Sequence, residues 1–275
     1  MTTATTDIQS LEETAREIRR KSLNVIHDAG SGHPGGSLSG ADILTALYFG
    51  GIMHYDPANP KLPERDRFIL SKGHATGLLY TVLSRAGYFP ESDLAGYRKI
   101  NSARNLSGHP HPKTPGVEIA TGSLGQGLSV GHGIALSARL DGLDFKVYVL
   151  LGDGELQEGQ VWEAAMSAAK FKTNNLVALV DFNKVAQDNI TKDLKDLEPL
   201  EDKWAAFGWD VIRIDGHNMA QVMDALQKPL HESKPRVIIA DTIKGKGVSF
   251  MEGKTAWHGV APNDEDLQKA LKELE

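Results

Sequence analysis

The residues with the clearest capacity for chemistry stand at the ends of two apolar stretches in the middle of the chain. The first stretch, VYVLL, runs directly into Gly152-Asp153-Gly154, and the second, LVALVDF, ends at Asn183 one strand–helix–strand unit later. Because ligands bind at the carboxyl ends of strands in an open α/β sheet, we expect Asp153 and Asn183 to meet at one edge. Carboxylate and amide oxygens are ligands that Mg²⁺ accepts together with phosphate oxygens.

A phosphate would fit beside these two residues, because the helix expected after Asp153 attracts anions at its N-terminus. The carboxylate would repel that phosphate unless a cation lay between them, so the pattern favours a metal-bridged phosphate site. A simpler interpretation is that Asp153 only caps the following helix and that Asn183 only turns a loop. The spacing alone does not separate the two interpretations.

Two common phosphate-binding patterns are missing from the sequence. The segment before Gly253-Lys254-Thr255 has Val248 where a P-loop needs its first glycine. Gly125-Gln-Gly127 is followed by Gly131, one residue too late for the dinucleotide-binding fingerprint, and no convincing strand precedes it. A nicotinamide-binding fold is therefore poorly supported.

The elements that must position these residues alternate between helices and apolar strands. The spacing of apolar residues predicts helices over 7–28, 41–49, 75–86, 218–231 and 263–275, another after Gly127, and another through Trp162 and Ala169. Apolar runs predict strands at 68–70, 145–151, 176–182, 209–215 and 236–243. We expect loops at 31–37, 55–66 and 101–117. The alternation indicates an α/β fold with a parallel sheet covered by helices on both faces.

The composition is that of an ordinary globular protein. The 275 residues are 40% hydrophobic and 24% charged, a length that suits one large α/β domain or two small ones. The net charge of −6 argues against nucleic-acid binding, and the lack of cysteine excludes disulfides and thiolate chemistry. No apolar run reaches the roughly 18 residues that span a bilayer, and the N-terminal residues have no signal-peptide pattern. We therefore expect a cytoplasmic protein that contacts neither nucleic acid nor membrane.

Longer motifs make a more specific assignment. The segment from Asp153 to Asn183, which begins GDGELQEGQ, resembles the thiamine-diphosphate motif in the form found in transketolases. Four further segments resemble that family in the same order: SGHPGGSL, DRFILSKGH, SGHP with TPGVEIATGSLGQGL, and TIKGKGVSF with WHG. The resemblance covers essentially the whole chain. It implies one thiamine-diphosphate-binding domain of the diphosphate-binding type over residues 1–275, as in the N-terminal part of a transketolase.

The resemblance implies a site for thiamine diphosphate and Mg²⁺, which Ca²⁺ or Mn²⁺ could replace. By that resemblance Asp153, Asn183 and the backbone carbonyl of Val185 are the metal ligands. The cofactor-binding residues it implies are His74, Gly122, Leu124, Gly154, Glu155, Asn183 and His258. Glu158 resembles an acidic residue at the subunit interface that links two active sites.

The same resemblance implies four catalytic histidines, namely His33, His74, His109 and His258. Such an enzyme transfers a two-carbon glycolyl unit from a ketose to an aldose, commonly as sugar phosphates in the pentose phosphate pathway of carbohydrate metabolism. The cofactor acts as electron sink, while the protein orients it and moves protons. Histidine suits that task because its ordinary pKa lies near 6.5. A lone histidine would more often be structural, which is how we interpret His27, His54, His217 and His231.

Transketolases usually carry two further domains, of which the first grips the aminopyrimidine of the cofactor. The 17 residues that follow His258 here are too few for a domain. We expect either a fragment or one subunit of a split transketolase, and we favour an α2β2 assembly with a second polypeptide that carries the pyrimidine-binding and C-terminal domains. The small residues over 121–138 predict close packing against another helix or another subunit.

Two departures from the family pattern leave the sugar unidentified. Lys184-Val-Ala-Gln-Asp188-Asn189 stands where the family often ends this segment in Gln-x-Asp-Gly, and asparagine accepts the left-handed conformation of glycine less easily. Ala186 belongs to the same departure, and His111 stands where an acidic residue commonly follows GHP. The alternatives are another thiamine-diphosphate enzyme, such as a deoxyxylulose-phosphate synthase or a 2-oxo-acid decarboxylating subunit, and a scaffold half without chemistry. The segments SGHPGGS and WHG favour a transketolase.

Overall fold

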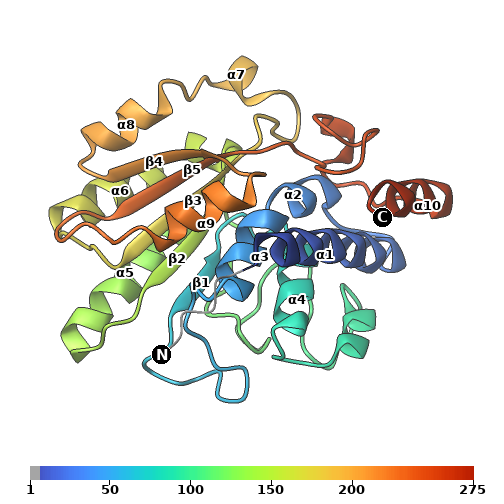
Figure 1. Cartoon of the computed structure of the whole chain (residues 1–275), viewed down its shortest axis with the longest axis horizontal. Coiled ribbons are helices and arrows are strands. Elements are labelled where there is room, and N and C mark those ends of the chain that lie inside the picture. The colour runs from blue at the N-terminus through green and yellow to red at the C-terminus, as the bar shows by residue number, and fades with distance from the viewer. Residues whose placement is uncertain (1–6) are drawn as a thin grey trace.

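The chain folds around a five-stranded parallel sheet, seen in a computed structural model that describes residues 7–275 (Figure 1). The strands are β1 (Arg67–Leu70), β2 (Val147–Gly152), β3 (Leu176–Phe182), β4 (Asp210–Asp215) and β5 (Arg236–Asp241). Their order across the sheet is β1-β2-β3-β5-β4, and every neighbouring pair is parallel. The predicted α/β class with a parallel sheet is therefore confirmed.

Each face of the sheet has its own apolar core, because successive side chains of a strand point to opposite faces. In β2, Tyr148 and Leu150 belong to one cluster and Val147, Val149 and Leu151 to the other. The first cluster includes residues of α1 (Ile8–Asp28), α3 (Ala41–Phe49), α4 (Thr76–Arg85) and α9 (Met219–Gln227). The second includes residues of α5 (Gln126–Asp141), α6 (Gly159–Lys170) and α8 (Leu200–Ala206). Both faces are covered by helices, as predicted.

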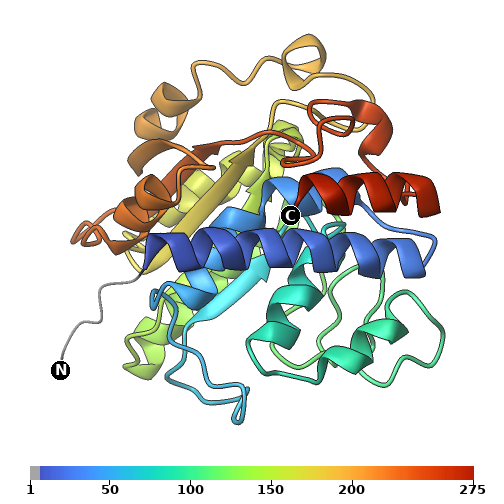
Figure 2. The same ribbon diagram turned by 45° about the vertical axis from the view of Figure 1, so that its right-hand side comes forward.

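The C-terminal helix α10 (Asp264–Glu273) lies alongside α1 (Figure 2). A small apolar cluster joins the two helices to the segment after β5 through Leu23, Val248, Met251, Leu267 and Leu274. The sequence predicts a solvated helix here. Its outer face is exposed, but Leu267 and Ala270 on its inner face are buried.

Three details differ from the sequence-based expectation. Residues 34–39, expected as a loop, form the short helix α2 (Pro34–Ser39), because Pro34 presets the first helical position and Ser37 Oγ bonds back to the carbonyl of His33. The helix α9 ends at Gln227 instead of 231, because a proline disfavours helical backbone in the residue before it, which here is Lys228. The remaining short elements were not anticipated: α7 (Thr191–Leu194), α8, and single turns at Glu91–Gly96, Gly154–Gln157 and Thr255–Trp257.

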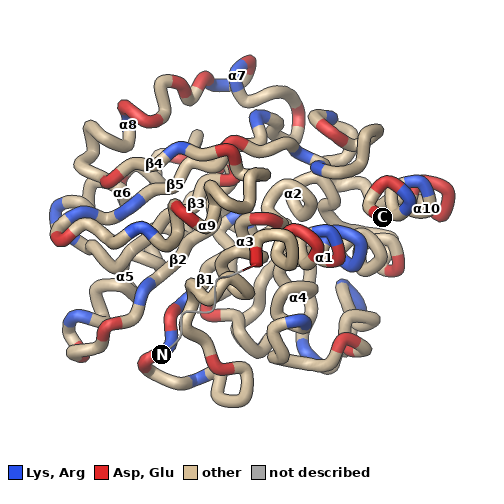
Figure 3. Tube along the Cα trace, viewed as in Figure 1, with Lys and Arg blue, Asp and Glu red and all other residues tan. Residues whose placement is uncertain are grey.

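Acidic and basic residues are interspersed along the chain, as α1 and α10 illustrate (Figure 3). In the part of the chain that the structure describes, no helix combines the length and apolar character needed to cross a bilayer.

The small residues of α5 allow the helix to approach the sheet closely. A Cβ at Gly127 would collide with Ser71 Oγ, and one at Gly131 would lie 2.6 Å from Val149 Cγ2. The predicted close packing is therefore present, but at these two positions the neighbour is the sheet region of the same chain and not another helix or subunit.

We expect Gly131→Ala to lower the free energy of unfolding by about 1–3 kcal/mol, the usual cost of overpacking a core. The matched control is Gly133→Ala in the same helix, where a Cβ would meet nothing within 4 Å. There the substitution should raise the stability by about 0.5–1 kcal/mol, because alanine is the better helix former. Urea unfolding of both variants measures the difference, and equal effects would contradict the close contact.

Candidate functional site

A cavity of about 390 Å³ opens at the carboxyl edge of the sheet, where an open α/β fold places its ligands. It lies over the ends of β2 and β3 and is closed by α2, the segment before α5 and the segments after β1 and β5. Every metal, cofactor and catalytic residue that the sequence analysis assigned lines it: His33, His74, His109, Gly122, Leu124, Asp153, Gly154, Glu155, Asn183, Val185 and His258. The structure thus brings together residues from five separate motifs.

Asp153 and Asn183 meet because β2 and β3 are neighbours whose register pairs Gly152 with Asp181. The Asp153 carboxylate accepts hydrogen bonds from the backbone N–H of Gly154 at 2.8 Å and of Lys184 at 2.5 Å. Asp153 therefore caps the short turn Gly154–Gln157, whereas the helix expected directly after it, α6, begins only at Gly159; Asp153 also links the two strand ends. The two interpretations are compatible.

The Asp153 carboxylate is buried, with 3% of the residue exposed, and forms no ion pair among the described residues. Burial, together with the nearby negative charge of Asp181, raises its pKa to about 6. A buried carboxylate with only backbone donors is a site that gains from a bound cation.

The neighbouring oxygens complete a donor set that suits Mg²⁺. Asn183 Oδ1 accepts the backbone N–H of Val185 at 3.1 Å, and the carbonyl of Val185 accepts Lys244 Nζ at 2.8 Å. Carboxylate, amide and carbonyl oxygens are the hard ligands that this ion prefers. The residues present therefore fit the predicted metal.

Two glycines line the cavity where the backbone comes close to the histidines. Gly122 has φ 140°, and a Cβ there would lie 2.7 Å from His109 Cδ2. Gly36, on α2, faces Lys72 Nζ and His74 Nε2, which a Cβ would approach to 3.2 and 3.4 Å. Side chains at these positions would fill the space beside the histidines, so the cavity has the shape expected of a cofactor cradle.

Three of the predicted histidines form a compact cluster. The ring centroids of His33, His74 and His258 lie 5.0 to 5.4 Å apart. Burial, followed by nearby cations, lowers the pKa of His33 to about 4 and of His258 to about 3, and burial with Lys72 lowers the pKa of His74 well below its usual range. The cluster is therefore neutral near pH 7. His109 lies across the cavity against Gly122.

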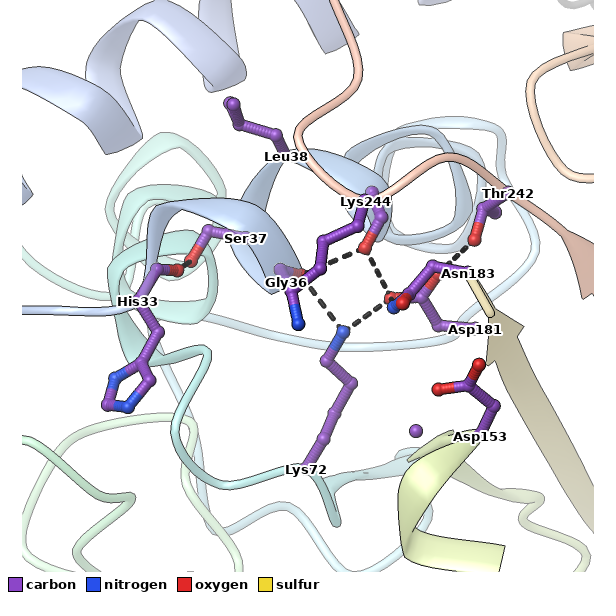
Figure 4. Close-up of polar contacts among 12 residues, drawn as sticks. His33, Gly36, Ser37, Leu38, Lys72, Asp153, Asp181, Asn183, Thr242 and Lys244 are labelled. Carbon is purple, nitrogen blue, oxygen red and sulfur yellow. Dashed lines mark hydrogen bonds and ion pairs between the residues drawn. The ribbon is translucent and has the colours of Figure 1, made fainter. Parts of the chain in front are cut away.

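Two buried lysines of the cavity were missed by the sequence analysis. Lys72 Nζ pairs with Asp181 and donates to the Gly36 carbonyl at 2.9 Å (Figure 4). Lys244 Nζ lies 2.7 Å from His258 Nδ1 and donates to the carbonyls of Val185 and Ala186. Burial, then Lys72, lowers the pKa of Lys244 to about 8. A lysine at the end of an apolar strand, as in SKGH and TIKGKG, was the signal that could have revealed them.

Asp181 lies below the cavity and connects several segments through its buried carboxylate. Its buried carboxylate accepts Lys72, Ser39 Oγ at 2.6 Å and Thr242 Oγ1 (Figure 4). Burial alone would raise the pKa of this carboxyl, but the Lys72 charge and the hydrogen bonds hold it below its ordinary value. One side chain thus ties β3, α2 and the segment after β5 together below the cavity.

Glu155, a predicted cofactor residue, has its carboxylate occupied within the chain. It accepts Ser71 Oγ and the backbone N–H of Gly125 on one oxygen, and the N–H of Gly152 on the other. In this arrangement Glu155 positions the segments that carry Leu124 and Asp153, and a direct cofactor contact stays a prediction. Glu158 is exposed at the start of α6, and its interface role also stays a prediction.

The two family departures have structural consequences different from those expected. The left-handed residue of the loop after β3 is Lys184, with φ 67°, and Asn189 is not among the residues with positive φ. Asn189 therefore does not adopt the left-handed conformation that glycine favours. His111 accepts the N–H of Lys113 at 3.1 Å and is not among the residues that line the cavity.

Two histidines outside the cavity, His217 and His132, are held by partners on both ring nitrogens. His217 Nδ1 lies 2.7 Å from the buried Asp42, which also pairs with Arg19, and His217 Nε2 accepts the N–H of Ile243 at 2.8 Å. His132 bonds Ser167 and Thr173 on opposite ring nitrogens. The contacts of His217 agree with its structural interpretation. Through Ile243 they also hold in place the segment that leads to Lys244.

We expect His33 and His258 to make the chain less stable on acidification between about pH 6.5 and pH 4. Their depressed pKa values mean that these two groups bind more protons in the unfolded state than in the folded state in this window, so their contribution to the free energy of unfolding falls as pH falls. Asp153, whose pKa is raised to about 6, contributes in the opposite direction. His258→Gln should show a smaller loss between pH 7 and pH 5 in urea unfolding. His231→Gln, an exposed control, should follow the unchanged chain, and a parallel pH profile for His258→Gln would contradict the neutral cluster.

Comparison with known proteins agrees with this geometry. Residues 10–274 match the family model described as "Transketolase, thiamine diphosphate binding domain". A relative in Actinobacillus succinogenes, named as one subunit of an apulose-4-phosphate transketolase, is 46% identical over 96% of this chain and 95% of its own length. The 6-deoxy-6-sulfo-D-fructose transketolase subunit SqwG of a Clostridium species is 45% identical over 96% of both chains. The transketolase structure from Campylobacter jejuni superposes with TM-score 0.90 and 35% identity, over 97% of this chain and 43% of that one.

The fold and the cavity define an α/β domain of the thiamine-diphosphate-binding class. The chain belongs to the transketolase family. The predicted membership, and with it the prediction of a transferase of this type, is confirmed. The chain spans nearly the full length of the two relatives named as subunits, but less than half of the Campylobacter transketolase.

Proposed function

We propose that the chain is the diphosphate-binding subunit of a transketolase that requires thiamine diphosphate and Mg²⁺. The enzyme transfers a two-carbon glycolyl unit from a ketose, or its phosphate, to an aldose, and it acts with a second subunit. The single observation that carries this proposal is the cavity in which the oxygen donors of Asp153 and Asn183 face two buried lysines and the histidine cluster. Metal, diphosphate and sugar hydroxyls each have suitable partners there.

In this proposal Asp153, Asn183 and the Val185 carbonyl hold the metal. Gly154 lies at the end of β2 where its backbone can approach a phosphate, and Lys244 supplies a positive charge for the diphosphate. Lys244 now contacts the carbonyl assigned to the metal, so we expect its ammonium to move toward the diphosphate when both bind. The cofactor, when bound, supplies an electron sink for cleavage of a carbon–carbon bond.

The histidines of the cavity can then bind the sugar. His33, His109 and His258 come from three different segments and line one cavity, where they can exchange hydrogen bonds with the substrate hydroxyls. His74 lies within the same cluster, beside Lys72 and Gly36, nearer the diphosphate. Neutral imidazoles can donate at one nitrogen and accept at the other, which suits proton transfer near neutral pH.

We further propose a ketose that carries an anionic group as the donor. The names of two relatives specify a phosphorylated and a sulfonated sugar, and both are anionic. The sugar's distal end would be bound by the second subunit, in an α2β2 assembly to which Glu158 and the exposed side of α5 contribute. Support for a separate subunit comes from the relatives named as subunits and of nearly equal length.

The test is reconstitution. The purified chain alone should show no ketol transfer, and addition of a second subunit with the pyrimidine-binding domain should restore it in the presence of Mg²⁺. Xylulose 5-phosphate and pyruvate, offered as alternative donors, separate a transketolase from a 2-oxo-acid enzyme. Full activity of this chain alone would contradict the two-subunit proposal, and use of pyruvate in preference to ketoses would contradict the reaction.

A further inference from the structure

Arg98 contacts the ring of His33, with Nη2 3.3 Å from Nδ1. We propose that Arg98 is a positioning residue that fixes His33 as the tautomer with its proton on Nε2, so that His33 meets the substrate as a hydrogen-bond donor. The contact with substrate rests on the proposed function, whereas the tautomer is a property of this chain alone.

The direction of the hydrogen bond follows from the chemistry of the two groups. A guanidinium has five N–H donors, no acceptor, and does not lose its proton in proteins. Nδ1 of His33 must therefore be the acceptor, and a neutral imidazole that accepts at Nδ1 carries its proton on Nε2. Burial and the surrounding cations keep the ring neutral, since they lower its pKa to about 4.

Arg98 is itself held from both sides, so its guanidinium has little freedom to turn away. Nη1 donates to Ser31 Oγ at 2.8 Å, Nε donates to Tyr97 Oη at 3.2 Å, and the backbone N–H donates to the Leu106 carbonyl at 2.7 Å. A Cβ on Gly108 would lie 3.0 Å from the Arg98 Cζ atom. The guanidinium is therefore packed between the segment that carries His33 and the segment that carries His109.

The backbone of Arg98 also has an uncommon conformation. Its φ of 54° lies in the left-handed region, which residues other than glycine adopt at some energetic cost. The surrounding hydrogen bonds sustain this conformation, and strain of this kind is concentrated at functional sites. The conformation is consistent with a residue that is placed to direct its side chain.

Nε2 of His33 has no hydrogen-bond partner among the described residues, and it faces Gly259, where a Cβ would lie 3.3 Å from it. Gly259 follows His258, whose ring centroid lies 5.4 Å from that of His33, and both rings line the cavity. The groups whose charges act on the ring are Arg98, His109, Lys244 and Lys72, and none of them is an acid. No carboxylate among these groups could draw the proton from Nε2 or stabilise a second proton on the ring.

The consequence is a defined role for His33. In the resting enzyme it can donate from Nε2 to a sugar oxygen, but it has no free lone pair to act as a base. A substrate hydroxyl that must lose its proton has to use another acceptor. Arg98 thus makes His33 a proton donor and not a proton acceptor, although Arg98 itself does not contact the substrate.

The tautomer can be read directly from ¹⁵N spectra of the full chain labelled at histidine, with the His33 signals assigned by comparison with His33→Gln. We expect an unprotonated, pyridine-type Nδ1 and a protonated, pyrrole-type Nε2 at pH 7. A protonated Nδ1, or a ring protonated at both nitrogens, would overturn the proposal. Because the unchanged chain decides this question, the result does not depend on whether a variant folds.

Arg98→Met then tests the cause. It should shift His33 toward a mixture of tautomers, and Arg98→Lys should recover part of the original signature, because an ammonium can still donate. The matched control is Arg104→Met, on the same loop, since Arg104 pairs with Asp93 at 2.7 Å and does not contact His33. An unchanged His33 spectrum in a folded Arg98→Met would overturn the positioning role.

Kinetics of the two-subunit complex separate this inference from the proposed function. Arg98→Met should lower kcat/KM for ketol transfer by about 10- to 100-fold, the range seen when a metal-binding histidine loses the partner that orients it. Arg98→Lys should recover part of the loss, and Arg104→Met should not change the rate. If the unchanged complex shows no ketol transfer, the proposed function fails while the tautomer result stands. If Arg98→Met is folded and fully active, the functional part of the inference fails.

Discussion

Asp153→Ala is expected to abolish Mg²⁺-dependent binding of thiamine diphosphate by the complex of this chain with its second subunit. The variant removes the one charged ligand of the proposed metal, so the diphosphate would face the end of β2 without a bridging cation. We expect the affinity to fall by more than about 100-fold, because even loss of an outer partner of a metal site costs 10- to 100-fold. Titration calorimetry with and without Mg²⁺ measures the change.

Asp153→Asn sharpens the test by separating binding from folding. The pKa of Asp153 is raised in the folded chain, so the neutral form favours folding and the ionised form costs stability above about pH 6. At pH 8, in the absence of metal, the uncharged asparagine should therefore leave the free energy of unfolding unchanged or raise it. Cofactor affinity should nonetheless fall. A variant that is stable and still binds tightly would contradict the metal role.

The matched control is Asp188→Ala. Asp188 lines the same cavity, but it is exposed on the loop and not at a strand end. Its removal changes the charge near the site by the same amount without removing a proposed ligand. Equal losses in the Asp153 and Asp188 variants would indicate that net charge, and not metal ligation, controls binding.

The arrangement of Asp153 and Asn183 could be predicted because the rules that place them are local. Continuous apolar runs define β2 and β3, parallel strands end at one edge, and the residue after each run must lie at that edge. The histidines were found only through the motifs around them, since nothing in a single histidine's spacing indicates a cavity. The same reasoning failed for residues 31–37, where proline and glycines suggested a loop but Pro34 starts a short helix.

What the sequence could not provide are contacts between distant segments. Arg98 reaches His33 from an irregular region, and that contact depends on a left-handed backbone that no sequence pattern around Arg98 signals. Lys244 meets His258 because the chain after β5 folds back over the cavity. Loops of this kind are held by hydrogen bonds between side chains, and such bonds have no periodicity to recognise. The chemistry of the site is therefore shaped most by the part of the fold that is least predictable.

The buried pair of Lys72 and Asp181 carries the second large prediction. Lys72→Met is expected to lower the free energy of unfolding by about 3–5 kcal/mol, the usual cost of leaving one buried charge without its partner. Both side chains are almost wholly inaccessible, with 1% and 0% of each residue exposed. Asp181 would keep Ser39 and Thr242 as donors but would lose the only cation that pairs with it among the described residues.

A double-mutant cycle distinguishes a charge effect from lost packing. Asp181→Asn removes the charge and keeps the shape, so Lys72→Met combined with Asp181→Asn should be less destabilising than the sum of the single variants. Lys269→Met, which breaks an exposed ion pair with Glu265, is the control and should leave stability unchanged within error. Additive effects would mean that Lys72 acts through packing alone. A positive coupling would mean that the ion pair itself stabilises the contact between the carboxyl end of β3 and the segment after β1, which also carries His74.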